Sequence, residues 1–202
     1  MSFLSNFYTY AGMIPLIHSR HWSPGKIIPV FASQFLGNQG RYELDYLKQY
    51  YRNYDYDYIH DSLFASEGFT QEGQPLLGRC FDYSDVTFDD RIDVFAHGNE
   101  DGMYSLSLQA LATYFKSKGL RSVGVIKFNV CRSGLDKYFL LNAKCIFLLN
   151  GISFAWMSAP RGDINYFPPF KYISGHILKE DRYRLLNGNI TKKFPGTKYV
   201  YQ

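Results

Sequence analysis

Long apolar runs are absent from this chain of 202 residues, and cysteine is scarce. No segment approaches the roughly 18 to 20 consecutive apolar residues that a membrane-spanning helix needs. The three cysteines, Cys80, Cys131 and Cys145, are too few and odd in number for a disulfide framework, and no clustered Cys or His spacing resembles a zinc site. These absences argue against a disulfide scaffold, and we predict no metal site and no membrane span.

Residues 1–12 also lack the basic leader and the apolar stretch of an ordinary secretory signal peptide. Together with the few cysteines, this predicts a reducing site of action. We expect either a cytoplasmic protein or one that is secreted into a host cell without such a signal. Both settings produce the same sequence chemistry, so both stay open.

The residues that are abundant indicate an ordinary globular protein. Hydrophobic residues make up 46% of the chain and charged residues 20%, and the aromatic share of 18% comes mainly from tyrosine and phenylalanine. At this length one core is sufficient. We predict a single domain over 1–202, with an N-terminal arm at 1–25, an α/β core at 26–150 and a C-terminal segment at 151–202.

Two short apolar runs, 92–96 and 123–130, have the length and composition of buried strands in a parallel sheet. Apolar residues between them recur at three- and four-residue steps, as in an amphipathic helix: Leu106, Ala110, Leu111, Tyr114 and Phe115. Ser105 or Ser107 is placed to cap this helix, and Gly119 lies just past its end. The pattern predicts a strand, helix and strand with the two strands parallel.

Segments before this unit extend it into a larger sheet. Residues 26–33 form the first predicted strand, although Pro29 argues against a fully paired central position. Residues 41–51 have helical spacing. We therefore predict an α/β fold with a mostly parallel central sheet flanked by helices.

Segments after the unit predict one more helix and a hairpin. We expect a short helix over 135–144 and strands over 145–149 and 152–157, joined by a turn at 150–151. In this interpretation Cys145 lies in a buried strand and is inert.

His97 and Cys131 directly follow the two predicted parallel strands. Strands joined by a helical crossover end at the same carboxyl edge of a sheet, where active sites of open α/β sheets lie. An imidazole beside a thiol can activate it as a nucleophile and can protonate a leaving group. We predict that His97 and Cys131 form a catalytic pair.

The surrounding residues suit this chemistry. We predict that the backbone N–H groups of Gly98 and Cys131 form an oxyanion hole. Residues 132–134 suit a tight turn into a helix, whose N-terminus would favour a thiolate. The acidic residues at 100–101 would either orient His97 or cap the helix that follows.

With one strand ending in His97-Gly98 and a later strand ending in Cys131 before a small-residue turn, the chain resembles the caspase-like cysteine peptidases. This clan (CD) includes caspases, legumains, gingipains, clostripain and the self-cleaving domains of large bacterial toxins, which are nearest in size. The longer caspase signature Gln-Ala-Cys-Arg-Gly is not present, since residues 129–134 spell NVCRSG. The resemblance implies a caspase-like three-layer sandwich and a cysteine endopeptidase of bacterial effector or toxin type. Autoproteolysis occurs in the toxin-type relatives, and whether this chain cleaves itself is left open.

The resemblance also implies substrate and ligand sites. In caspase-like folds the segment after the nucleophile's helix lines the pocket for the residue before the scissile bond, which makes Ser158, Ala159 and Arg161 the expected substrate contacts. Catalysis would need neither a third acid nor a cofactor. In the toxin-type relatives a basic surface binds inositol hexakisphosphate as an activator. Residues 151–202 carry 8 Lys or Arg against 3 Asp or Glu, so they can form such a site or a solvated basic tail.

Other interpretations fit the same residues. A free cysteine ending a buried strand is commonly a small apolar side chain, and a His-Gly pair can be a turn. The chain would then be a catalytically silent α/β effector domain that binds a host protein. A deamidase or transglutaminase would share the Cys/His chemistry but usually places Cys before His. No nucleic-acid motif accompanies the basic charge, so we predict no nucleic-acid partner, and the oligomeric state is left open.

Overall fold

An α/β arrangement is present in the computed structural model, which describes residues 24–32, 57–59, 82–104, 106–167, 170–173, 176–177 and 183–192. The helices in this part are α3 (Leu108–Ser117) and α4 (Tyr138–Leu149). The strands are β1 (Ile27–Ala32), β2 (Asp57–Ile59), β3 (Arg91–Phe95), β4 (Gly98–Asn99), β5 (Gly102–Met103), β6 (Ser122–Asn129), β7 (Ser153–Pro160), β8 (Ile164–Phe167), β9 (Phe170–Ile173), β10 (His176–Ile177) and β11 (Tyr183–Asn187). The predicted helix over 41–51 and nearly all of the predicted arm lie outside the described residues.

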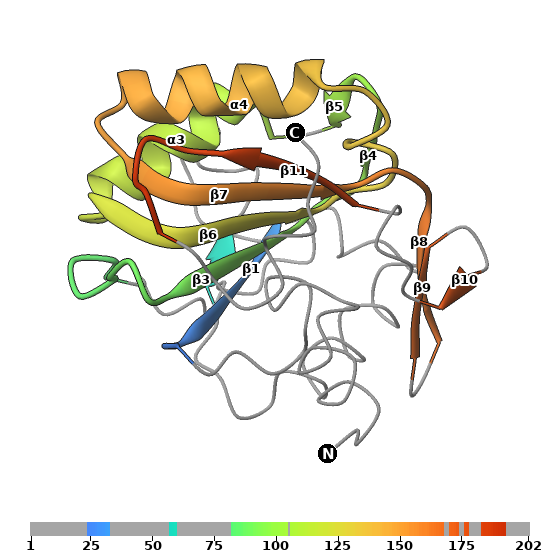
Figure 1. Cartoon of the computed structure of the whole chain (residues 1–202), viewed down its shortest axis with the longest axis horizontal. Coiled ribbons are helices and arrows are strands. Elements are labelled where there is room, and N and C mark those ends of the chain that lie inside the picture. Colours follow the sequence, from blue (N-terminus) through green and yellow to red (C-terminus); the bar gives the residue numbers. More distant parts are fainter. Residues whose placement is uncertain are drawn as a thin grey trace, which may run out of the picture.

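Six strands form a mostly parallel main sheet in the order β11-β7-β6-β3-β1-β2 (Figure 1). Only its β11 edge strand runs antiparallel to its neighbour. The chain passes from β1 outward to β2 and then returns to β3 on the other side of β1. The strand order therefore reverses between β1 and β3, and ligands of open α/β sheets bind at the carboxyl ends beside such a switch point.

Both described helices cover the same face of this sheet (Figure 1). The crossovers from β3 to β6 and from β6 to β7 progress in one direction along the sheet, so right-handed connections place α3 and α4 on one side. The predicted α/β class with a mostly parallel sheet is confirmed. The described part contains the sheet and one helical layer of the predicted three-layer sandwich.

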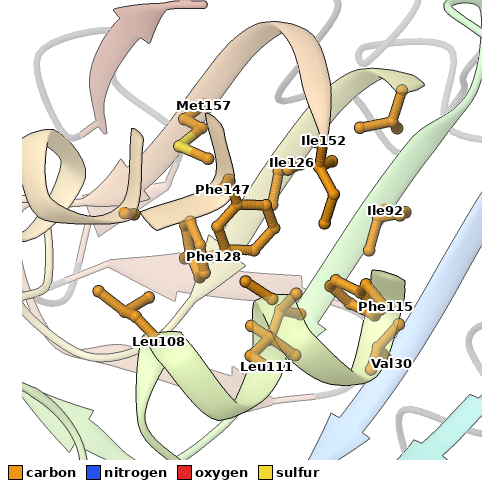
Figure 2. Packing of buried hydrophobic residues seen from close by; sticks show 14 of the residues in the cluster. Val30, Ile92, Leu108, Leu111, Phe115, Ile126, Phe128, Phe147, Ile152 and Met157 are labelled. Carbon is orange, nitrogen blue, oxygen red and sulfur yellow. The ribbon is translucent and has the colours of Figure 1, made fainter. Parts of the chain in front are cut away.

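The predicted strand, helix and strand are confirmed as β3, α3 and β6. Ser107, rather than Ser105, is the cap of α3, because its Oγ accepts a hydrogen bond from the Ala110 N–H at 3.1 Å. Gly119 follows the helix with a φ of +93°, a conformation that favours glycine. Apolar side chains of the sheet and both helices form one core on this face (Figure 2).

The prediction for 145–157 was wrong in its first half. Residues 145–149 belong to α4, and Cys145 is exposed on that helix rather than buried in a strand. Gly151 has a φ of +77° and ends the helix instead of turning a hairpin, so β7 is parallel to β6. Although α4 is apolar, no helix in the described residues is long and apolar enough to cross a membrane.

Pro29 lies in β1, which has β3 on one side and β2 on the other. Pairing with β2 starts only at Val30, one residue after Pro29. The proline therefore sits where β1 has a strand on one side only, as its missing N–H requires.

Candidate active site

His97 and Cys131 lie at equivalent positions beyond neighbouring parallel strands. β3 ends at Phe95 and β6 ends at Asn129, and these two residues are register partners. Extending this register by two residues places His97 opposite Cys131 at the carboxyl edge of the sheet. Because adjacent strands are about 4.8 Å apart, we expect His97 and Cys131 to lie near each other at this edge.

The alternation of side chains assigns both residues to the face opposite the helices. On and just after β3 and β6, the residues that join the helix-side core are Ile92, Val94, Ala96, Val123, Ile126, Phe128 and Val130, and from Ile126 onward those of β6 alternate. His97 and Cys131 follow Ala96 and Val130, so their side chains belong to the other face. Cys131 packs against the cluster of Ile164 and Tyr183, and the Tyr183 ring centroid lies 5.4 Å from Nζ of Lys127, whose side chain is on that face, which agrees with this assignment.

Polar side chains are buried along this second face of β3 and β6. Arg91 donates from Nε and Nη2 to the two carboxylate oxygens of Asp93 at 2.7 and 2.9 Å. Both side chains are buried, as are Lys127 and Asn129 on β6. Buried charges persist only where other groups compensate them, so this face is a specific polar environment rather than a solvated surface.

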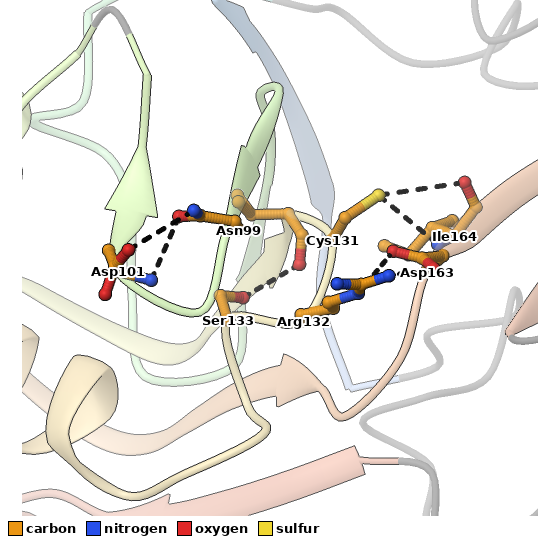
Figure 3. A network of polar contacts seen from close by, with 8 residues as sticks. Asn99, Asp101, Cys131, Arg132, Ser133, Asp163 and Ile164 are labelled. Carbon is orange, nitrogen blue, oxygen red and sulfur yellow. Dashed lines mark hydrogen bonds and ion pairs between the residues drawn. The ribbon is translucent and has the colours of Figure 1, made fainter.

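The Cys131 thiol rests against the start of β8. The Ile164 N–H donates to Sγ at 3.4 Å, and Sγ lies 3.9 Å from the Ile164 carbonyl oxygen. Figure 3 shows the sulfur directed toward Ile164 and away from Asn99 and Asp101. Sequence reasoning did not name Ile164, and its position just after the predicted substrate segment was the one available signal.

A cation lies next to Cys131 in the sequence. Arg132 has a φ of +56°, and its guanidinium donates to both carboxylate oxygens of Asp163 at 2.9 and 3.0 Å. These hydrogen bonds and the charge of Asp163 raise the pKa of Arg132, and the charges of Glu100 and Cys131 add smaller contributions. A positive group beside a cysteine favours the thiolate, although here Asp163 offsets much of that charge.

The backbone after Cys131 is extensively hydrogen-bonded. The N–H groups of residues 132–135 donate to the carbonyls of Gly162, Val130, Pro160 and Arg132, in that order. None of these four can serve as an oxyanion donor as well, and the predicted role of the Cys131 N–H stays a prediction. The helix predicted over 135–144 is present but begins later than expected, because α4 starts at Tyr138.

Gly98 belongs to a small hairpin of β4 and β5 at the His97 side of the site. The Tyr104 N–H donates to the His97 carbonyl at 3.0 Å, which makes Gly98 and Met103 a non-hydrogen-bonded pair. The Gly98 N–H therefore points away from β5, a direction that an oxyanion donor needs. The acidic residues at 100–101 form the hairpin turn and do not cap α3, which corrects one of their two predicted roles.

The predicted substrate contacts differ in accessibility. Ser158 and Ala159 are both 0% exposed within β7, whereas Arg161 is exposed just beyond it. In this arrangement Arg161 alone of the three presents a side chain that a substrate can touch.

Basic side chains described after residue 180 bond to the protein itself. Arg184 donates to the carbonyls of Gly134 and Leu135, and Lys192 pairs with Asp89. An inositol hexakisphosphate site therefore stays a prediction.

Chemistry at this edge consists of a thiol, an imidazole and backbone donors. Within the part of the chain that the structure describes, no group of three or more His, Cys, Asp or Glu side chains is placed to hold a metal ion. Such a set of groups suits acyl transfer through a covalent thioester. Comparison of the sequence with protein-family models and with curated proteins finds no match to either.

Proposed function

We propose that this chain is a cysteine endopeptidase in which Cys131 is the nucleophile and His97 the general acid and base. The observation that carries the proposal is the pairing of Phe95 with Asn129 in adjacent strands. His97 and Cys131 each lie two residues after one member of this pair. The resemblance to caspase-like peptidases supports this function. We also propose that the whole fold is the three-layer caspase-like sandwich.

In the proposed reaction His97 takes the Cys131 proton, and the thiolate attacks the scissile carbonyl. A C–S bond forms and the carbonyl becomes an oxyanion, held by the N–H groups of Gly98 and Cys131. His97 then gives its proton to the amide nitrogen as the C–N bond breaks, releasing the new amino terminus. His97 next activates water, which cleaves the thioester and restores the thiol.

Ile164 limits substrate access to one side of the thiol. Because Ile164 backbone atoms border Sγ, an incoming peptide carbonyl must approach from the His97 side or displace the start of β8. Arg161 is the exposed side chain that we assign to substrate contact at this edge. Action inside a host cell, self-cleavage and activation by inositol hexakisphosphate are parts of the proposal supported by the resemblance alone.

The test is site-resolved alkylation with a limiting amount of iodoacetamide near neutral pH, quantified by peptide mass spectrometry. Cys145 is an exposed internal control on α4, whereas Cys131 is half-buried. We expect Cys131 to react faster than Cys145 despite its lower exposure, and His97→Ala to slow Cys131 alone. Cleavage of a peptide library should be lost in Cys131→Ala.

The opposite order of reactivity would reject the proposal. If Cys145 reacts faster than Cys131 and His97→Ala changes neither rate, Cys131 is an ordinary buried thiol. The chain would then fit the silent α/β domain that binds a host protein.

A further inference from the structure

Arg184 connects the antiparallel edge strand to the loop that carries the nucleophile. In β11 it is the register partner of Ala159 on β7. Its Nε donates to the Gly134 carbonyl at 2.9 Å, and its Nη2 donates to the Leu135 carbonyl at 3.1 Å. One planar guanidinium thus fixes two successive peptide groups shortly after Cys131 in the sequence.

The same loop is held from its other side by the end of β7. The Gly134 N–H donates to the Pro160 carbonyl at 2.7 Å, and a Cβ at position 134 would overlap the Ala159 carbonyl oxygen. Gly134 therefore sits between β7 and the Arg184 side chain, with both its N–H and its carbonyl engaged. The loop has little freedom to move without breaking these bonds.

The hydrogen bonds of Arg184 are also expected to be stronger than those of Arg132, the arginine within the loop. The Arg132–Asp163 pair is exposed, with side-chain exposures of 50% and 47%, and exposed ion pairs contribute little. Arg184 is half-buried, and it gives charge-assisted hydrogen bonds to the carbonyls of Gly134 and Leu135. Its loss would leave those carbonyls without that donor.

We propose that Arg184 is a positioning residue, which holds the 132–135 loop and thereby fixes Cys131 at the carboxyl edge of the sheet, next to the end of β3. This inference rests on the proposed function, because it concerns the geometry of the same nucleophile. Arg184 acts through the loop and does not touch the reacting atoms. A displacement of about 1 Å at a reacting group can cost about a hundredfold in rate, so a modest loosening should be measurable.

The experiment compares Arg184→Gln, Arg184→Lys and wild type in the iodoacetamide assay across pH 5 to 10, alongside amide hydrogen exchange of the 131–136 segment. Arg121→Gln is the matched control, because Arg121 is exposed before the amino end of β6 and its loss removes the same charge. We expect Arg184→Gln to slow Cys131 at least about tenfold and to move its pH midpoint toward that of an ordinary thiol, about 8.5. Exchange in the loop should rise, and Cys145 should be unaffected.

Arg184→Lys separates geometry from charge. Because a lysine cannot donate to both carbonyls in the fork geometry, it should restore the Cys131 rate only in part. Full restoration by lysine, or wild-type rates and exchange in Arg184→Gln, would overturn the inference. If wild-type Cys131 is itself slow and indifferent to His97→Ala, the proposed function fails, and the exchange measurement alone then decides whether Arg184 holds the loop.

Discussion

Position 98 has no room for a side chain, because Gly102 of β5 and Val130 after β6 pack closely against it. A Cβ there would overlap the Gly102 carbonyl oxygen and Cγ1 of Val130. We expect Gly98→Ala to destabilise the protein by about 1–3 kcal/mol through overpacking, measured by urea unfolding. Gly151→Asn is the control, since position 151 has open space and a positive φ that asparagine tolerates. A wild-type unfolding midpoint for Gly98→Ala would contradict the close approach of the two segments.

Individual residues differ in how far sequence could identify them. His97 and Cys131 were proposed as site residues because each directly follows an apolar run, and Gly98 because it follows His97. The contacts of Ile164 with Cys131 and of Arg184 with Gly134 were not predicted. They join segments that are distant in the chain and depend on where β8 and β11 pack. Local sequence patterns carry no information about such pairings.

The N-cap of α3 is a test at the level of one element. Ser107→Ala removes the side-chain acceptor of the Ala110 N–H and should cost about 0.5–2 kcal/mol of stability, measured by thermal or urea unfolding. Ser117→Ala is the matched control, because its hydroxyl donates to the Tyr114 carbonyl and satisfies no unpaired helix N–H. Equal losses in the two variants would show that Ser107 does not act as a cap.

The two helices show when periodicity is informative. α3 has polar residues between its apolar ones, so its helical spacing could be predicted from the sequence. In α4 the run at 145–149 is apolar on every side, and Leu149 is 85% exposed. A short apolar run of this kind fits a buried strand and a helix equally well, which is why the helix was predicted to end too early.

At the scale of the whole molecule, the parallel unit and the sheet edge at which its strands end were predictable, but the complete strand order was not. Helical crossovers have a fixed hand, so β3, α3 and β6 could be placed from their sequence pattern alone. The position of β2 beyond β1 and the antiparallel return of β11 depend on long-range pairing. The switch point between β1 and β3 became visible only with that order.

The two helices that cover the sheet should stabilise each other. The rings of Phe115 on α3 and Phe147 on α4 lie 6.2 Å apart, centroid to centroid, at an interplanar angle of 62°. A double-mutant cycle with leucine at both positions, measured by urea unfolding, should give a coupling of about 0.5–1.5 kcal/mol. The control is a cycle of Phe115→Leu with Leu185→Ala, because Leu185 lies on β11 outside this core. The effects of these two substitutions on the free energy of unfolding should add within about 0.5 kcal/mol. Additivity in both cycles would mean that the two crossover helices pack on the sheet independently.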